Sequence, residues 1–115
     1  MDGLLRTANI KSDMPSVDVA IKRITYNIKN ASAFGVTAIK FIHGYGSSGK
    51  GGAIRSEVRK YLDRLAAHGK IKFYVKGEDF SIFDEHTRNA FAICGALRCD
   101  NDLERHNNGI TIVIL

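Results

Sequence analysis

Residues 43–52, with the sequence HGYGSSGKGG, combine a histidine with five glycines and one lysine. An imidazole titrates near neutral pH, so His43 can give or take a proton in a reaction. Glycines allow positive φ and a close approach of the backbone, so amide N–H groups can point at an anion. Because Lys50 and Arg55 add positive charge, this stretch predicts an anion-binding corner whose natural ligand is a phosphate group.

The same stretch contains the letters of a nucleotide-binding phosphate loop, G-x-x-x-x-G-K, from Gly44 to Lys50. In that loop the lysine is followed by Ser or Thr, whose hydroxyl group holds a magnesium ion. Gly51 stands at this position here, and no second apolar strand ends in an acidic residue that would bind magnesium. We therefore expect phosphate binding without nucleotide hydrolysis. A pocket for a small phosphorylated ligand is one form that this binding could take.

The elements that must position this stretch are predicted by hydrophobic periodicity and by the residues at their ends. Apolar residues recur at helical spacing in two segments, which predicts two helices. The first helix is expected to end at Gly35 and the second at Gly69. Strands are expected at 4–11, 36–42, 70–76 and 110–115, and a short helix at 84–98. The prediction is a single α/β domain (residues 1–115) of order β-α-β-α-β-β. It has a mixed four-stranded sheet, two main helices and a helical excursion at 78–107.

Two expectations concern the core. The segment KIKFYVK (70–76) alternates charged and apolar residues, which predicts a strand with one face in solvent. Core packing is the expected role of most aromatic residues other than Tyr45, Phe73 and Tyr74, including Phe34, Phe41, Phe80, Phe83 and Phe91.

Charged residues are unevenly distributed along the chain. Residues 1–76 carry 14 Lys/Arg against 5 Asp/Glu, whereas residues 77–115 carry 3 against 7, within a net charge of +5. One strongly basic part of a small domain indicates an anionic partner, and nucleic acid is the first candidate. We expect no membrane span, because no apolar run approaches about 20 residues, and no signal peptide in the charged segment 1–13. Two cysteines are too few for a disulfide framework, so a cytoplasmic location is expected.

A strand ending in I-H-G-x-G-S, then glycines, then a helix of the form I-R-x-x-V-R-x-x-L resembles the Smr domain. That domain is the C-terminal module of certain MutS-related proteins and also occurs alone. The closing N-N-G-I-T-I-V-I-L is similar to its last strand, and the resemblance covers roughly residues 8–76 and 108–115. It implies a four-stranded sheet with two helices packed on it, as in the C-terminal domain of bacterial translation initiation factor three. It also implies binding of nucleic acid, which several members of the family nick or cleave.

Two motifs accompany cleavage in that family, L-D-x-H on the first strand and H-G-x-G after the second. The second motif matches residues 43–46, so the resemblance makes His43 the candidate catalytic residue. The first motif is not found, because residues 8–11 (ANIK) or, in another register, 10–13 (IKSD) stand in its place. Lys11 at this position can neutralise a phosphate. Since no carboxylate–histidine pair is supplied, endonuclease activity is left open, and a divalent metal is the cofactor to expect if the protein cleaves.

The predicted function is contact with the phosphate backbone of RNA or DNA. In this prediction Tyr45 stacks on a base or a sugar. Phosphates are met by the glycine backbone and by basic side chains, at Gly44, Gly46, Lys50, Gly51, Arg55, Arg59 and Lys11. In the acidic excursion, Asp84 is expected to cap a helix, and no metal site is assigned. A protein-interaction module whose acidic excursion docks a partner is the alternative, and the oligomeric state is not predicted.

Overall fold

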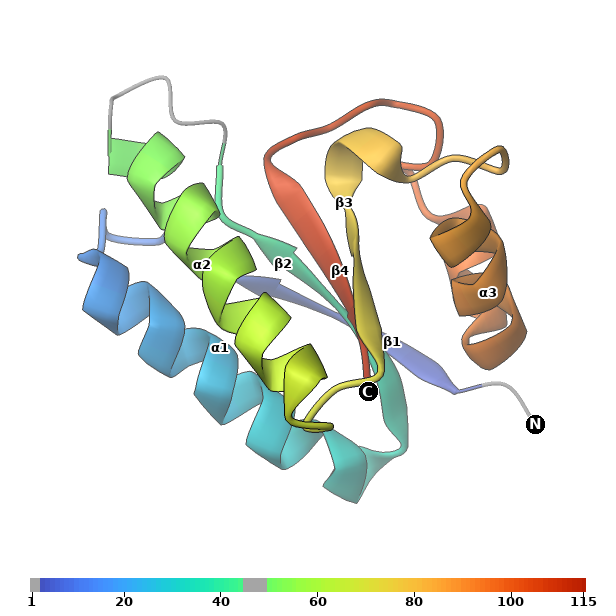
Figure 1. Cartoon of the computed structure of the whole chain (residues 1–115), viewed down its shortest axis with the longest axis horizontal. Coiled ribbons are helices and arrows are strands. Elements are labelled where there is room, and N and C mark those ends of the chain that lie inside the picture. Colours follow the sequence, from blue (N-terminus) through green and yellow to red (C-terminus); the bar gives the residue numbers. More distant parts are fainter. Residues whose placement is uncertain (1–2, 45–49) are drawn as a thin grey trace.

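The computed structural model of the chain describes residues 3–44 and 50–115, without the side chains of Ser32 and Lys50. Four strands form one mixed sheet in the order β1-β2-β4-β3 (Figure 1). They are β1 (Leu4–Asn9), β2 (Val36–Ile42), β3 (Phe73–Lys76) and β4 (Ile110–Ile114). Strand β2 is parallel to β1 and antiparallel to β4, which is also antiparallel to β3. The last strand thus lies between the second and the third, and β1 and β3 form the edges.

Helices cover both faces of the sheet (Figure 1). Helices α1 (Val17–Ala31) and α2 (Lys50–Ala67) pack on one face over a core that includes Phe41. Helix α3 (Glu85–Ile93) and the 3-10 turn η3 (Gly95–Cys99) pack on the other face over a second core that includes Phe80. The predicted order of strands and helices is confirmed. The helical excursion adds a third layer, in which α3 and η3 occupy the segment 85–99, where the sequence predicts one short helix at 84–98.

The two central strands are buried on both faces, which explains their nearly continuous apolar sequences. In β2, Ile39 and Phe41 belong to the core under α1 and α2, whereas Ala38 belongs to the core under α3. All five residues of β4 are buried. Strands predicted at 36–42 and 110–115 therefore agree with the structure to within one residue.

Residues at the helix ends supply capping hydrogen bonds and turn conformations. The hydroxyl oxygen of Ser16 accepts a hydrogen bond from the N–H of Val19 (3.3 Å) at the start of α1. The carboxylate of Asp84 accepts one from the N–H of Thr87 (2.9 Å) at the start of α3, so Asp84 is a helix cap as predicted. Gly35 has φ +74°, a conformation that favours glycine, directly before β2.

Two core predictions are wrong. Strand β3 has no open solvent face, because its consecutive residues Phe73 and Tyr74 pack, partly buried, against the cores on the two sides of the sheet. The alternation in the sequence could not show that α3 covers the second face. Phe34 and Phe83 are exposed, at 65% and 84% of their surface. Phe34 lies in the turn after α1, where the guanidinium of Arg6 stands 5.7 Å from its ring centroid.

Candidate nucleic-acid interface

Strands β1 and β2 end side by side, and this edge brings together several residues that the sequence predicts for the site. His43 and Gly44 follow β2, while Lys11 lies two residues beyond β1. The two chain segments stay paired past the strands, because the N–H of Ile10 donates to the O of Ile42 at 3.0 Å. A Cβ atom on Gly44 would lie 3.3 Å from Cδ of Lys11, and Lys11 is exposed. A basic side chain therefore stands directly beside the first glycine of the predicted motif.

The backbone of Gly44 has φ +85°, a conformation that residues with a Cβ atom rarely adopt. The N–H groups of His43 and Gly44 both donate to the O of Gly109, each at 3.0 Å. The missing Cβ of Gly44 therefore allows the side chain of Lys11 to pack closely against it, and the N–H of Gly44 is bonded to the residue before β4.

Three other predicted residues, Lys50, Gly51 and Arg55, belong to α2. Tyr45, Gly46 and the side chain of Lys50 are outside the described residues. The backbone of Lys50 and Gly51 belongs to the first turn of α2, where the helix dipole favours negative charge. Arg55 is half-buried one turn further on, and its charge is one cause of the lowered pKa of His43.

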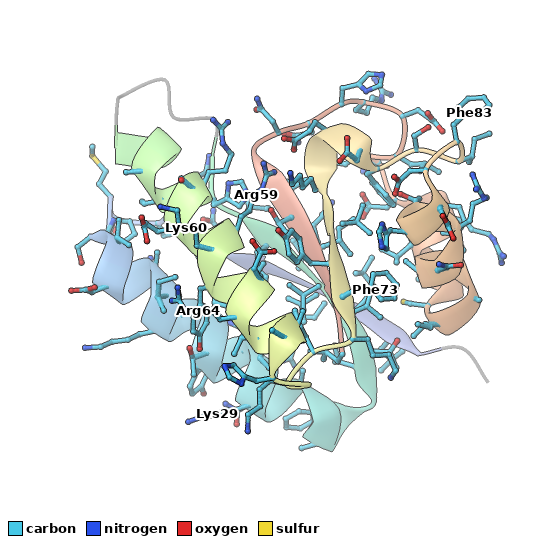
Figure 2. All side chains as sticks on the ribbon, in the orientation of Figure 1. Lys29, Arg59, Lys60, Arg64, Phe73 and Phe83 are labelled. Carbon is cyan, nitrogen blue, oxygen red and sulfur yellow. The ribbon has the colours of Figure 1, made fainter. Side chains whose placement is uncertain are left out.

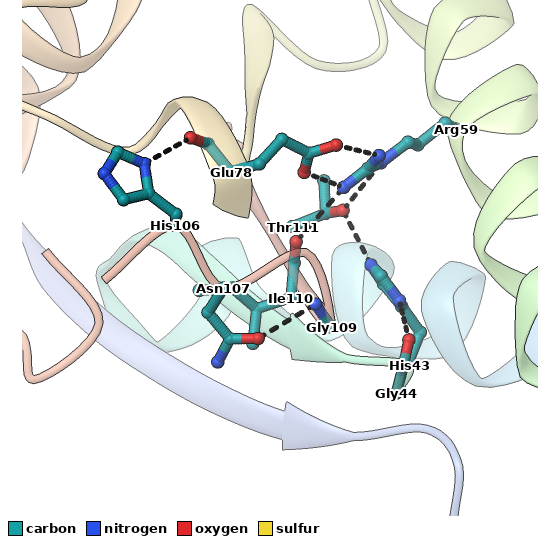
Figure 3. A network of polar contacts seen from close by, with 9 residues as sticks. All are labelled: His43, Gly44, Arg59, Glu78, His106, Asn107, Gly109, Ile110 and Thr111. Atoms are coloured by element: carbon teal, nitrogen blue, oxygen red, sulfur yellow. Dashed lines mark hydrogen bonds and ion pairs between the residues drawn. The ribbon is translucent and has the colours of Figure 1, made fainter. Parts of the chain in front are cut away.

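His43 is buried, with 1% of its surface exposed, and both ring nitrogens have partners (Figure 3). Nδ1 lies 3.1 Å from the O of Gly44, and Nε2 lies 2.8 Å from Oγ1 of Thr111. A carbonyl oxygen only accepts, so Nδ1 carries the proton and donates it to Gly44. Nε2 is then an acceptor, and the hydroxyl group of Thr111 donates to it. The side chain of His43 thus ties β4 to the turn after β2.

The charge state of His43 follows from this environment. Burial lowers the pKa of His43 to about 4, and the positive charges of Arg59 and Arg55 act in the same direction. The ring is therefore neutral at pH 7. A neutral ring whose nitrogens are both bonded fits a structural role. Its predicted catalytic role would require the ring to exchange these partners for substrate.

Arg59 on α2 is held by Glu78, the second residue after β3 (Figure 3). Its two terminal nitrogens donate to the two carboxylate oxygens at 2.8 and 2.7 Å, and its Nε lies 3.4 Å from Oγ1 of Thr111. Burial by itself would raise the pKa of Glu78, but the hydrogen bonds from Arg59 outweigh it and lower that pKa. The phosphate contact predicted for Arg59 would therefore have to compete with this ion pair.

A series of hydrogen bonds on the other face of the sheet also ends at this edge. Nζ of Lys40 donates to Oδ2 of Asp102 at 2.8 Å and to both carboxylate oxygens of Asp100 at 3.0 Å. Oδ1 of Asp102 accepts from the amide of Asn107 (2.9 Å), whose own Oδ1 accepts from the N–H of Gly109 (2.9 Å). The carbonyl group that holds the turn after β2 is thus anchored through the excursion.

Sequence reasoning missed three of these residues, Thr111, Glu78 and Gly109. Thr111 carries the one hydroxyl group in the apolar run ITIVIL, and a lone polar residue in a buried strand is a signal that could have been used. Glu78 had no comparable signal, because its partner Arg59 lies on a different element and 19 residues away.

The two helical layers differ in charge, as the uneven distribution of charged residues along the chain suggests. Helices α1 and α2 carry eight Lys/Arg against three Asp/Glu, on one side of the sheet. Residues 77–109, which supply the layer on the other side, carry three against seven. Figure 2 shows Lys29 on α1 and Lys60 and Arg64 on α2, and all three are exposed. One side of the domain is thus basic and the other acidic.

Comparison with known protein families, with curated proteins and with solved structures finds no match for this chain. Within residues 3–44 and 50–115, no group of three or more His, Cys, Asp or Glu side chains is placed to hold a metal ion. The helices of the same residues include none that is long and apolar enough to cross a membrane.

Proposed function

We propose that this domain binds nucleic acid through the phosphate backbone, with the layer of helices α1 and α2 facing the ligand. The observation that carries the proposal is the concentration of eight Lys/Arg on these two helices, opposite an acidic third layer. A polyanion would be attracted to one side of such a domain and repelled by the other, which orients it before contact. The resemblance to the Smr domain supports the same function.

Within this side, the edge where β1 and β2 end is the proposed position of the closest phosphate. Lys11 is exposed there and packs against the backbone of Gly44, and the first turn of α2 presents its positive end. Arg55 adds a charge one turn further along the helix. Contacts of this kind fix position without reading bases, so both RNA and DNA are candidate ligands.

The state of His43 favours binding over cleavage. A general base needs a nitrogen that can reach the attacking group, and both nitrogens of His43 are bonded within the protein. We therefore place His43 among the residues that shape the site and leave its catalytic role as a prediction to be tested.

The test is a salt series with labelled single-stranded RNA, single-stranded DNA and duplex DNA, between about 50 and 200 mM salt. Replacing Lys11 and Arg55 together by Ala should weaken binding and reduce the salt slope by about 0.7 to 0.9 for each lost phosphate contact. Arg105→Ala removes an exposed charge from the acidic layer and should leave the slope unchanged. Absence of binding at the lowest salt, or an unchanged slope in the double variant, would overturn the proposal. Product analysis of wild type and His43→Ala on gels, with and without magnesium, tests cleavage in the same samples.

A further inference from the structure

The outer edge of β3 is the feature from which a second binding site is inferred. β3 ends the strand order of the sheet, so no other strand of residues 3–44 and 50–115 lies on one side of its backbone. On its other side, β3 pairs with β4 in a register that sets Phe73 opposite Ile114 and Val75 opposite Ile112. The free backbone groups of β3 can be identified from the hydrogen bonds that β4 makes on its far side.

In an antiparallel pair, residues alternately turn their backbone groups toward and away from the partner strand. The N–H of Leu115 donates to the O of Thr37 in β2 at 3.0 Å, so Leu115 and Val113 turn toward β2. Ile114 and Ile112 therefore turn toward β3, where they meet Phe73 and Val75. The intervening residues of β3, Tyr74 and Lys76, must direct their N–H and C=O groups outward. The C=O of Lys76 caps the 3-10 turn η2 (Gly77–Asp79), whereas the N–H of Lys76 and both groups of Tyr74 have no partner among the described turns, loops and caps.

A groove of about 350 Å³ runs along this edge. All four residues of β3 line it, together with Ala66 of α2 and with Asp79, Asp84 and His86. On one wall, the hydroxyl group of Tyr74 donates to the carboxylate of Asp63 at 2.7 Å. On the other wall, the ring centroid of Phe73 lies 5.6 Å from the ring centroid of His86 on α3. Both walls are thus held in place by contacts between β3 and the flanking helices.

The charge around the groove selects the kind of partner. Asp79 is exposed, and its carboxylate makes no hydrogen bond or ion pair with any described residue. Asp84 and Asp63 add two more carboxylates, whereas Lys76 is the one cation among the described lining residues. The excursion that supplies the outer wall is acidic as a whole. A complementary segment is therefore basic.

We propose that the edge of β3 binds an extended, basic segment of another protein, which adds to the sheet as a fifth strand. Main-chain hydrogen bonds to Tyr74 and Lys76 would hold it, as in other cases of strand addition. Apolar residues at alternate positions would contact Phe73 and His86, and Lys or Arg between them would meet Asp79. A second copy of the chain fits less well, because pairing of β3 with itself would bring two acidic rims together. One wall of the groove belongs to α2, but its lining does not include Lys11, Gly44 or Arg55, so the two sites can be tested separately.

The decisive variant removes one outward N–H without disturbing the ladder to β4. Lys76 has φ −67°, which proline adopts without strain, so Lys76→Pro deletes the donor. Lys76→Ala, the matched control, removes the same charge and keeps the N–H. The probe is a synthetic peptide of about eight residues that alternates Lys and Val, with blocked ends. A second peptide with Glu in place of Lys tests the charge preference.

Binding is followed by NMR spectra of the 15N-labelled chain. With the Lys peptide, the amide signals of Tyr74 and Lys76 should shift, and their hydrogen exchange should slow. Lys76→Pro should weaken binding about tenfold, the equivalent of one hydrogen bond, while Lys76→Ala should not. Asp79→Lys, an exposed substitution that keeps the fold, should reverse the preference between the two peptides. Shifts confined to other elements, equal binding by Lys76→Pro, or a dimer in sedimentation that this variant abolishes would overturn the proposal.

Discussion

The hydroxyl oxygen of Thr111 lies 2.8 Å from Nε2 of His43 and links it to Arg59, whose Nε lies 3.4 Å from the same oxygen. This hydroxyl group donates to the ring and accepts from the guanidinium, so it uses both of its hydrogen-bonding functions. The three residues come from β4, from the end of β2 and from α2. One side chain on the central strand therefore sets the relation between the turn after β2 and the helix that carries the basic residues.

Replacing Thr111 by Val keeps the shape of this side chain and removes the link. Nε2 of His43 would then be buried without a donor, which costs about 1 to 3 kcal/mol of the free energy of unfolding. Urea denaturation followed by circular dichroism measures this loss. Thr111→Ser, which keeps the hydroxyl group, should lose less, and a Val variant as stable as wild type would show that the link carries no stability.

The lowered pKa of His43 makes the stability of the fold depend on pH. Between pH 6.5 and about 4, the unfolded chain binds a proton at this ring that the native state does not bind. The contribution of His43 to the free energy of unfolding is therefore fully present above pH 6.5, and it is lost progressively as the pH decreases to about 4. The expected loss is about 3 kcal/mol, since each pKa unit corresponds to about 1.36 kcal/mol.

Urea titrations of wild type and His43→Gln at several pH values isolate this contribution. Gln does not titrate, so the difference in stability between the two proteins should shrink as the pH falls from 6.5 to 4. A constant difference across that range would mean that His43 is charged in the folded protein.

Hydrophobic periodicity was sufficient to predict the order of the elements, because the signals are local. The run VTAIKFI between glycines predicts β2, and Gly35 with its positive φ ends the preceding segment as expected. Where burial depends on distant parts of the chain, prediction failed. The exposure of Phe83 and the partial burial of Phe73 depend on where the excursion packs, which no local pattern contains.

The site divides in the same way. His43 and Gly44 could be predicted from their position after a buried strand, with Lys11 added by the resemblance. Thr111 and Glu78 could not, because they meet the site through the register of β4 and the turn after β3. The predicted anion contact by the N–H of Gly44 also depended on a distant residue, since the carbonyl of Gly109 takes that hydrogen bond.

Glu78→Gln tests whether Arg59 can bind a phosphate group of nucleic acid. This change removes the negative charge that now holds the guanidinium at 2.7 Å, so Arg59 becomes able to bind a phosphate. Affinity for single-stranded RNA should rise, and the salt slope should steepen by about 0.7, the value of one added contact. The stability cost should be small, about 1 kcal/mol, because the carboxylate is partly exposed. Unchanged binding with an intact fold would show that Arg59 lies outside the phosphate path.

Lys40→Met tests the anchoring of the site from the far side of the sheet. Lys40 is 8% exposed, and burial alone would lower its pKa, but the hydrogen bonds to Asp102 and Asp100 raise it. Met fills a similar volume and leaves two carboxylates without their cation, so the free energy of unfolding should fall by about 3 to 5 kcal/mol. The matched control is Lys60→Met, which removes an exposed lysine paired weakly with Glu57 and should change stability by less than about 0.5 kcal/mol.

Removing the two carboxylate charges together with Lys40 distinguishes the contribution of the ion pairs from the contribution of side-chain packing. Adding Asp100→Asn and Asp102→Asn to Lys40→Met should recover part of the lost stability, because no charge is then left buried.

In the wild-type protein, the amide nitrogen of Asn107 donates to Asp102, and the amide oxygen of Asn107 accepts from the N–H of Gly109. The carbonyl group of Gly109 in turn fixes the turn after β2. Lys40→Met should therefore also speed hydrogen exchange at the N–H of Gly44, measured by NMR. Equal stability of the single and triple variants would mean that the methylene groups of Lys40, and not its charge, support this edge of the sheet.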